Sequence, residues 1–324
     1  MGMVKLPRTS RARICNSFPR SVKCNYYRSI CIGTTSLAER SSPEECCTFR
    51  GSLAKLDVKS GAVLWQTFML PENHGELGQY AGAAIWGSSP SIDVHRKHVY
   101  IATGNVYSIP ERVSQCQENQ NNSTMPTNLD ACVEPENHGN SIPALDLDSG
   151  DIKWYRQLGG YDVWFLASPM MLRTRVNGTN RDIVVAVQKG GFAWALDRNN
   201  GSLCGQRIQG GGTWGAATDK KMVYTNIGNA DGKNFTLKPS NYITIVSVAN
   251  GVLFAGSPNP QGSIYAMDTG SGKILWSYDA RATVYGGMSI SNGCIYVGSG
   301  YKVNLGFINP TFTAGTSLFA FCVK

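Results

Sequence analysis

The sequence contains no apolar run approaching the 18 residues that a membrane-spanning helix needs, and only 16% of its 324 residues are Asp, Glu, Lys or Arg. We therefore expect no membrane span. Because 42% of the residues are hydrophobic, the chain can bury a large core, which excludes an intrinsically disordered protein and a coiled coil. Its 36 glycines, which separate short runs rich in Val, Ile and Tyr, indicate one large all-β body.

Acidic residues are absent from residues 1–38, whereas seven Lys and Arg residues occur there. The rest of the chain holds 23 basic and 22 acidic residues, so almost all of the net charge of +8 lies at the N-terminus. A nucleic-acid-binding surface needs clustered Lys and Arg with stacking aromatic residues, and no such stretch follows, so no nucleic-acid partner is expected. We predict that residues 1–28 form a basic segment and that residues 29–324 form the folded body. The basic segment is either disordered, as a transit peptide would be, or the product of a misassigned start.

The ten cysteines include no Cys-x-x-Cys pair and no Cys/His spacing typical of a zinc site, so disulfides are favoured over structural zinc. Residues 107–139 form a polar stretch that we predict to be an inserted, exposed loop. Within it, Cys116 and Cys132 are the best candidates for a local disulfide. All the histidines stand in polar contexts, which predicts that they are exposed: His74, His95, His98 and His138.

Five segments match the N-glycosylation pattern Asn-x-Ser/Thr. They begin at Asn121, Asn122, Asn177, Asn200 and Asn234. Together with the cysteines, these sequons favour a glycoprotein of the secretory pathway or the extracellular space. Residues 1–30 contain no apolar segment of the kind found in signal peptides, so this expected location does not rest on a recognisable leader.

One short pattern returns four times, with a Gly four residues and a Trp eight residues after an Asp. The copies are GSLAKLDVKSGAVLW (51–65), NSIPALDLDSGDIKW (140–154), GFAWALDRNNGSLCG (191–205) and GSIYAMDTGSGKILW (262–276). The third copy ends in Gly205 instead of Trp. Each copy predicts a β-hairpin with a tight turn, and further strands precede the hairpins at 89–104, 181–188 and 246–257. Four strands per repeat predict an all-β protein with the β-propeller fold.

The constant spacing within the repeat predicts structural roles for its Asp and Trp residues. Asp57, Asp146, Asp197 and Asp268 are predicted to accept hydrogen bonds from turn amides, and the Gly of each turn is predicted to adopt a positive φ. Trp65, Trp154 and Trp276 are predicted to pack between neighbouring blades.

The intervals between the turn aspartates are 89, 51 and 71 residues, so the repeat is interrupted. Residues 212–228 predict two strands that no Asp-x3-Gly hairpin follows, which indicates half a blade. Residues 284–300 and 317–323 predict three strands, whose fourth would come from the N-terminus. We expect about six blades, two of them incomplete.

The repeat, written G-x-L-x-A-L-D-x-x-[ST]-G-x-[IV]-x-W, resembles the blade signature of the pyrroloquinoline quinone (PQQ) family, the quinoprotein alcohol dehydrogenases, over nearly all of residues 30–323. Strings such as CCTFRGSLAKLDVKSG and GYDVWFLA are most similar to plant members labelled polyvinyl alcohol dehydrogenase-like. The resemblance implies PQQ and calcium as cofactors and a small-molecule or polymeric alcohol as substrate. Because such relatives have eight blades, it also implies a shortened version without N-terminal blades and with deletions near 167–169, 203–210 and 241–246.

The resemblance assigns the calcium ligands to two strings. The family's S-x-A-E string matches IGTTSLAER and places Glu39 at the metal carboxylate, and its G-T/S-G-N string matches YIATGN and places Asn105 at the metal amide. A hard cation prefers oxygen ligands of these two kinds.

The resemblance also implies residues that hold PQQ. Trp86, in GAAIWGSSP, matches the tryptophan on which the quinone stacks, and Lys189, in VQKGGFAWALDRNNG, matches the cation that hydrogen-bonds the quinone oxygens. The family's proton acceptor is the second acid of D-x-W-D, and GYDVWFLA carries Asp162 and Trp164 but Phe165 in that place. Asp162 is therefore the candidate catalytic base from three residues earlier, and Trp164 a further cofactor contact.

Two functions follow from these matches. The first is a PQQ-dependent oxidoreductase of alcohols, weakened or inactive because the usual base is missing. The alternative is a non-catalytic propeller that keeps the scaffold as a binding or assembly surface. Phe165 and the missing blades favour the alternative, whereas the matches at Glu39, Trp86, Asn105 and Lys189 favour the enzyme.

Overall fold

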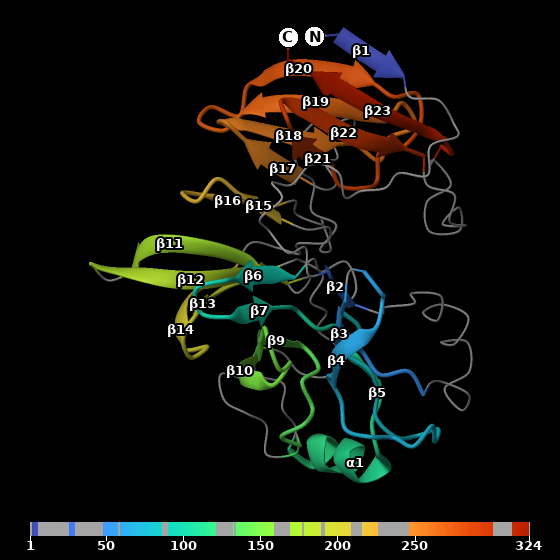
Figure 1. Cartoon of the computed structure of the whole chain (residues 1–324), viewed down its shortest axis with the longest axis vertical. Coiled ribbons are helices and arrows are strands. Elements are labelled where there is room, and N and C mark those ends of the chain that lie inside the picture. Colours follow the sequence, from blue (N-terminus) through green and yellow to red (C-terminus); the bar gives the residue numbers. More distant parts are fainter. Residues whose placement is uncertain are drawn as a thin grey trace. The chain divides into compact units, whose positions relative to one another are not determined.

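The computed structural model describes residues 2–5, 26–29, 48–57, 59–85, 90–120, 132, 134–158, 169–176, 178–188, 192–208, 216–225, 246–300 and 313–323. These residues are mostly β-strand with one α-helix among them (Figure 1). The chain divides into two compact units, one of residues 23–212 and one of residues 1–22 with 213–324. No helix in the described ranges is long and apolar enough to cross a membrane.

Among its described residues, the unit of residues 23–212 contains four antiparallel sheets. The first has the order β2 (Tyr26–Ser29), β3 (Ser52–Leu56), β4 (Val63–Phe68), and a small one pairs β5 (Ala81–Gly82) with β8 (Val106–Ser108). The next has the order β10 (Ile152–Gln157), β9 (Ser141–Asp146), β7 (His98–Tyr100), β6 (Ser91–Asp93). The last has the order β11 (Met170–Val176), β12 (Thr179–Val187), β13 (Phe192–Asp197), β14 (Leu203–Ile208).

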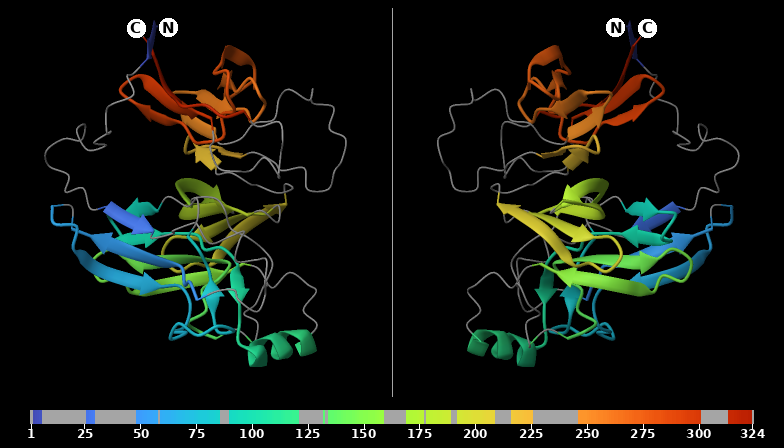
Figure 2. Two further views of the ribbon diagram at one scale, coloured as in Figure 1. Left: turned by 90° about the vertical axis from the view of Figure 1, so that its right-hand side faces the viewer. Right: turned by 90° about the vertical axis from the view of Figure 1, so that its left-hand side faces the viewer.

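The described part of the other unit contains three antiparallel sheets. One pairs β15 (Ala216–Thr218) with β16 (Val223–Thr225), and the next has the order β17 (Val246–Ala249), β18 (Val252–Gly256), β19 (Ser263–Asp268), β20 (Ile274–Asp279). The last has the order β1 (Gly2–Lys5), β23 (Ser317–Cys322), β22 (Cys294–Ser299), β21 (Ser289–Ser291). In both views of Figure 2, β1 and β23 lie side by side near the two ends of the chain.

The sheets confirm the predicted fold class of four-stranded antiparallel blades. Among the described residues, six sheets follow the repeat, and two of these are incomplete, with three strands in β2–β4 and two in β15–β16. The pair β15–β16 is the predicted half blade. The N-terminal strand β1 supplies the fourth strand of the last sheet, as predicted, by pairing with β23.

The Asp-x3-Gly turns have one geometry in all four repeats. In the second copy, the Asp146 carboxylate accepts hydrogen bonds from the amides of Asp148 (2.8 Å) and Ser149 (3.0 Å), and the Gly150 amide donates to the Asp146 carbonyl (2.9 Å). The hydrogen bond from the Ser149 amide is the main reason why the pKa of Asp146 falls to about 2. The turn glycines have φ angles of +74°, +84°, +70° and +71° at Gly61, Gly150, Gly201 and Gly272. The predicted structural role of the Asp and Gly residues is confirmed.

Two of the repeat tryptophans pack on the turn glycine of the next sheet. A Cβ atom on Gly150 would lie 2.6 Å from Cδ2 of Trp65, and a Cβ atom on Gly201 would lie 2.5 Å from Cε3 of Trp154. Glycine is therefore required at both positions for steric reasons as well as for its positive φ. The predicted packing of tryptophan between blades is confirmed at these two contacts.

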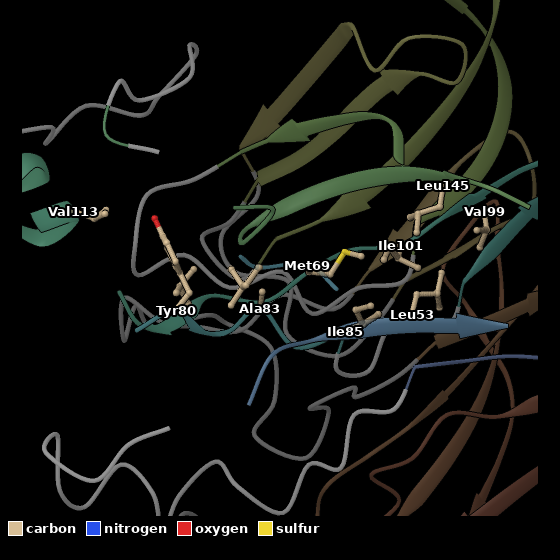
Figure 3. Packing of buried hydrophobic residues seen from close by; sticks show 11 residues of the cluster. Leu53, Met69, Tyr80, Ala83, Ile85, Val99, Ile101, Val113 and Leu145 are labelled. Atoms are coloured by element: carbon tan, nitrogen blue, oxygen red, sulfur yellow. The ribbon is translucent and has the colours of Figure 1, made fainter. Parts of the chain in front are cut away.

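Apolar residues from several sheets form the core of the 23–212 unit (Figure 3). Leu53, Val99, Ile101 and Leu145 are completely buried there, with Trp65 packed against them. A second cluster around Tyr100, Trp154 and Leu196 joins the sheet of β6–β10 to the sheet of β11–β14. Burial of such faces between adjacent sheets is what stabilises a blade that has two apolar faces.

The segment predicted as an exposed loop contains the single helix of the described residues, α1 (Glu111–Gln120). Pro110 precedes the helix and its carbonyl accepts hydrogen bonds from Val113 and Ser114. The Glu, Arg and Gln residues that follow are good helix formers, so local propensity overrides the polar, loop-like composition. The predicted Cys116–Cys132 disulfide is confirmed.

A second disulfide joins Cys294 to Cys322. These residues face each other across the β22–β23 pair. The sequence did not predict this bond because it follows from strand register, which is set over a separation of 28 residues.

Candidate functional site

Asn105 is the only predicted site residue in the described part of the chain. It ends the extended segment that continues β7, in which Thr103 donates its amide to the Ser141 carbonyl (3.0 Å) and Asn140 donates its amide to the Gly104 carbonyl (2.9 Å). The carbonyl of Asn105 accepts the amide of Ala83 at 2.8 Å. Both neighbouring segments therefore fix the backbone at Asn105.

The side chain of Asn105 is 5% exposed, and its Nδ2 lies 3.4 Å from the Val106 carbonyl, at the outer limit of a hydrogen bond. Burying an amide costs free energy unless partners compensate it. An amide oxygen is also the type of ligand that calcium takes. Asn105 is the one implied calcium ligand among the described residues. Its side chain therefore carries an oxygen of the kind that binds calcium, and its backbone is held by hydrogen bonds.

The Thr103 side chain joins the strand end around Asn105 to the backbone of the segment that leads into β9. The Thr103 hydroxyl donates to the His138 carbonyl (2.6 Å) and accepts the Ser141 amide (2.9 Å). A Cβ atom on Gly139 would come 2.5 Å from Cγ2 of Val106, so only glycine fits beside the strand that follows Asn105. Asn140 next to it has a φ of +52°.

His138 is buried with 8% exposure, so the prediction that all histidines are exposed was wrong for this residue. Its ring packs edge-on against Tyr155 with centroids 4.4 Å apart. Burial lowers the pKa of His138 to about 4, so the ring is neutral at pH 7. The polar residues around His138 in the sequence, Asn137, Gly139 and Asn140, are themselves buried or hydrogen-bonded, which is why polarity did not indicate exposure.

An ion network that the sequence analysis did not predict joins the sheet of β6–β10 to the sheet of β11–β14. Arg198 lies 2.9 Å from Asp93 and 3.2 Å from Asp182, and Arg96 lies 3.1 Å from Asp93 and 2.8 Å from Asp182. Burial alone would raise the pKa of Asp93, but hydrogen bonds from Arg96 and the charge of Arg198 outweigh it and the net shift is downward. The network is a structural contact between sheets, because every carboxylate in it already pairs with an arginine.

The other predicted site residues lie outside the described residues: Glu39, Trp86, Asp162, Trp164 and Lys189. Phe165 lies outside them too. Within the described ranges, no three His, Cys, Asp or Glu side chains come together as a metal site would require. The described residues thus hold one candidate ligand, Asn105, and its supporting shell.

The sequence of this chain, including the segment with Asn105, matches a known protein family. The sequence model of the family described as the glucose/ethanol/alcohol dehydrogenase β-propeller domain matches residues 2–204. The chain is 27% identical over 337 aligned positions to a polyvinylalcohol dehydrogenase of Pseudomonas sp, covering 79% of this chain and 48% of the relative. It is 24% identical to the polyvinylalcohol dehydrogenase of Sphingopyxis sp. (strain 113P3), covering 85% of this chain and 51% of the relative.

Among solved structures, the chain is similar to a quinohemoprotein alcohol dehydrogenase from Pseudomonas putida HK5. The TM-score is 0.59 at 14% sequence identity, over 85% of this chain and 56% of the other. At this identity the likeness shows the fold alone. The chain spans about half the length of the curated relatives that it matches.

Proposed function

The chain belongs to the family of glucose/ethanol/alcohol dehydrogenase β-propeller domains, and from this premise we propose that it is a PQQ-dependent oxidoreductase of alcohols, similar to polyvinyl alcohol dehydrogenase. The single observation that carries the proposal is the family match over residues 2–204, which includes the strand that ends at the buried Asn105. The substrate in this proposal is a small-molecule or polymeric alcohol.

In this proposal, five residues of the chain bind the metal ion and the cofactor. Glu39 and Asn105 would supply oxygen ligands to calcium, and Trp86, Trp164 and Lys189 would bind PQQ by stacking and hydrogen bonding. When bound, PQQ supplies the oxidising power that removes a hydride, with its two electrons, from the alcohol carbon. The buried amide of Asn105, whose Nδ2 makes only a 3.4 Å contact to the Val106 carbonyl, supports this assignment.

Proton removal is the step in which this chain departs from its family. The hydroxyl proton of the alcohol needs a nearby base, and general-base catalysis contributes roughly 10²–10⁴-fold. Phe165 stands where the family has the acid, so Asp162 is the base of the proposed enzyme. We expect slow turnover for this reason.

A non-catalytic propeller is the second candidate, and the observation that favours it is Phe165. In that case the same residues would keep a cofactor-type scaffold without chemistry, and the propeller would serve as a binding surface. The two candidates differ in one measurable property, which is turnover of alcohol by the loaded protein.

The decisive experiment combines calorimetry and dye reduction. The full chain is titrated with PQQ in the presence and absence of Ca²⁺, and the loaded protein is then assayed for alcohol-dependent reduction of an electron acceptor. The proposal expects calcium-dependent PQQ binding that is lost in Glu39→Ala and Asn105→Ala. The matched control is Asn137→Ala, a second buried asparagine whose Oδ1 accepts the Gly139 amide, and it should retain binding.

Three outcomes separate the candidates. Binding with alcohol-dependent turnover supports the oxidoreductase, and binding without turnover supports the non-catalytic propeller. If PQQ does not bind the wild-type protein at all, or binds equally well in the Asn105→Ala variant, the proposed site is wrong.

Secretion and N-glycosylation belong to the same proposal. Asn200 is the one sequon asparagine whose surroundings the described residues include, and it is exposed in the turn between β13 and β14. Its Oδ1 accepts the Ser202 amide at 3.0 Å. A mass decrease on enzymatic deglycosylation that is smaller by one glycan in Asn200→Gln would support a glycan there. An equal decrease in the wild type and the variant, both secreted from eukaryotic cells, would contradict it.

A further inference from the structure

Gln188, which directly follows β12, has a polar side chain that is buried with only 1% of its surface exposed. Its Oε1 accepts the indole N–H of Trp194 at 2.8 Å, and its Nε2 donates to the Leu158 carbonyl at 3.3 Å. An indole nitrogen can only donate, so the contact with Trp194 fixes which end of the amide is the acceptor and leaves Nε2 as the donor. The side chain therefore joins its own sheet, through Trp194 on β13, to the residue that follows β10 in another sheet.

The preceding repeat builds the equivalent position with a short side chain. The Gln188 amide donates to the Phe192 carbonyl (2.7 Å) just as the Thr103 amide donates to the Ser141 carbonyl (3.0 Å). Phe192 and Ser141 hold the same place in their repeats, so Gln188 corresponds to Thr103. The Thr103 hydroxyl donates to the His138 carbonyl, in the segment that leads into its own hairpin. The long amide that reaches Leu158 is thus a departure from the preceding repeat.

The two backbone positions that this side chain joins each lie close in sequence to a residue of the proposed site. Gln188 is directly followed by Lys189, which is assigned to PQQ, and Leu158 precedes Asp162, which is assigned as the base, by four residues. Such short connections limit how far Lys189 and Asp162 can move once Gln188 and Leu158 are fixed. The hydrogen bond from Gln188 to Leu158 therefore constrains both site segments at once.

Further hydrogen bonds extend from Leu158 to the candidate calcium ligand. The Leu158 amide donates to the Asn140 carbonyl at 2.9 Å, and the Asn140 amide donates to the Gly104 carbonyl at 2.9 Å. Gly104 directly precedes Asn105 in the sequence. Gln188, Leu158 and Asn140 are 1%, 3% and 2% exposed, so water competes little for these bonds. A continuous series of buried hydrogen bonds therefore joins Gln188 to the residue beside Asn105.

We infer that Gln188 is a positioning residue of the PQQ site, whose amide holds the segments carrying Lys189 and Asp162 in place relative to the strand end at Asn105. This inference rests on the proposed function, because it concerns the same site. Gln188 acts through the backbone of Leu158 and not by touching the cofactor, since both polar atoms of its side chain are engaged within the protein. Loss of a residue that orients the ligands of a site typically weakens binding or activity roughly 10–100-fold.

The test measures the affinity of the full chain for PQQ by calorimetry at saturating Ca²⁺, which does not depend on turnover. Gln188→Met keeps an unbranched side chain of similar length but removes both hydrogen bonds. We expect this variant to bind PQQ roughly 10–100-fold more weakly than the wild type. Melting temperatures are measured in parallel, because a purely structural role would lower stability without changing the affinity of the folded protein.

Asn73 provides a matched control in the same unit of the chain. It is also a buried amide, 4% exposed, and its Nδ2 donates to the carbonyls of Thr48 and Tyr80 at 2.8 Å each. Asn73→Leu removes buried hydrogen bonds of the same kind, but neither acceptor lies in the segments that Gln188 joins. This variant should therefore lower the melting temperature and leave the PQQ affinity unchanged.

The conservative variant Gln188→Glu supplies a pH profile that tests the hydrogen bond to Leu158 directly. A carboxyl oxygen can accept the Trp194 N–H at any pH, but only the protonated acid can donate to the Leu158 carbonyl. The ratio of wild-type to variant affinity for PQQ should therefore increase as the pH rises through the pKa of the new carboxyl group. Comparison with the wild type at each pH removes the effect of ionisation of PQQ itself.

Several results would overturn the inference. If Gln188→Met binds PQQ as tightly as the wild type does, or if Asn73→Leu loses as much affinity, Gln188 does not position the site, although the proposed function stands. If Gln188→Met does not fold, the pH profile of Gln188→Glu decides, and an affinity ratio that is constant with pH overturns the inference. Failure of the wild-type protein to bind PQQ would refute the proposed function and this inference with it.

Discussion

Trp154 lies on Gly201 of the neighbouring sheet so closely that a Cβ atom on the glycine would come 2.5 Å from the indole. The Gly201→Ala substitution therefore adds overpacking, which costs about 1–3 kcal/mol, to the roughly 1 kcal/mol of placing alanine at positive φ. We expect chemical denaturation to show a loss of about 2–4 kcal/mol in the free energy of unfolding.

Gly178 provides the control for this prediction. It also has a positive φ, +79°, but among the described atoms none would lie within 4 Å of a Cβ atom added at this glycine. Gly178→Ala should cost only about 1 kcal/mol. Equal losses in the two variants would mean that the indole contact does not constrain Gly201.

Arg198 is predicted to stabilise the contact between two sheets. Asp93 is 4% exposed and pairs with Arg198 at 2.9 Å, so Arg198→Ala leaves a buried carboxylate with Arg96 as its remaining partner. Breaking a buried pair by removing one partner costs about 3–5 kcal/mol. Arg173→Ala is the control, because its side chain is 75% exposed and lies 3.8 Å from Asp182, and it should change stability little.

A double-mutant cycle checks whether this loss reflects the pair itself. Asp93→Asn in the Arg198→Ala background removes the buried charge that has lost one of its two arginine partners, and it should recover part of the lost stability. If the two substitutions are simply additive, Arg198 stabilises the protein through its other contacts, such as the ion pair with Asp182, and not through Asp93.

The repeat shows how far sequence can predict this molecule. Asp146 and Gly150 act locally within a hairpin, so their spacing predicted the turn and the positive φ correctly. The recurrence of the repeat predicted that Trp154 packs between blades, and its partner Gly201 belongs to the next sheet. The Asp93–Arg198 pair and the Cys294–Cys322 bond join residues that only the pairing of strands and sheets brings together. Such contacts have no local signal, and sequence spacing could not reveal them.

The candidate site contains one residue that the sequence predicted and one whose burial it did not predict. Asn105 was predicted from a four-residue string; the residue is buried and its carbonyl is hydrogen-bonded, and its role as a calcium ligand stays a prediction. His138 was missed as a buried residue, because its polar neighbours are satisfied by tertiary contacts such as that of Thr103 with the His138 carbonyl. Polarity of a segment therefore predicts exposure only where no such partners exist.

Stability is predicted to depend on pH through His138. Its pKa is about 4 in the folded protein and about 6.5 when unfolded, so the unfolded state binds the proton more readily between these values. Its contribution is present above pH 6.5 and is lost as the pH falls toward 4. The full loss is about 3 kcal/mol, from 1.36 kcal/mol per pKa unit.

The measurement compares unfolding free energies of the wild type and His138→Gln at pH 7 and pH 4.5. Glutamine does not titrate in this range, so the variant should lose less stability on acidification than the wild type does. If the difference in unfolding free energy between the wild type and the variant is the same at both pH values, His138 does not titrate as its burial implies.

The last prediction concerns the proton acceptor and decides between the two candidate functions. Phe165 has no group that can take a proton, so wild-type turnover with PQQ and Ca²⁺ should be slow, and Phe165→Asp should raise it roughly 10²–10⁴-fold if the rest of the site binds and orients the substrate. Calorimetric PQQ titration and the melting temperature are measured in parallel, so that a loss of folding is distinguished from a loss of chemistry. A stable, PQQ-binding Phe165→Asp protein without any gain in turnover would contradict the oxidoreductase with a missing base and favour the non-catalytic propeller. Fast wild-type turnover that Asp162→Asn abolishes would contradict the expected slow rate and would mean that Asp162 fully replaces the missing acid, since the amide keeps the size of the side chain but cannot accept the proton.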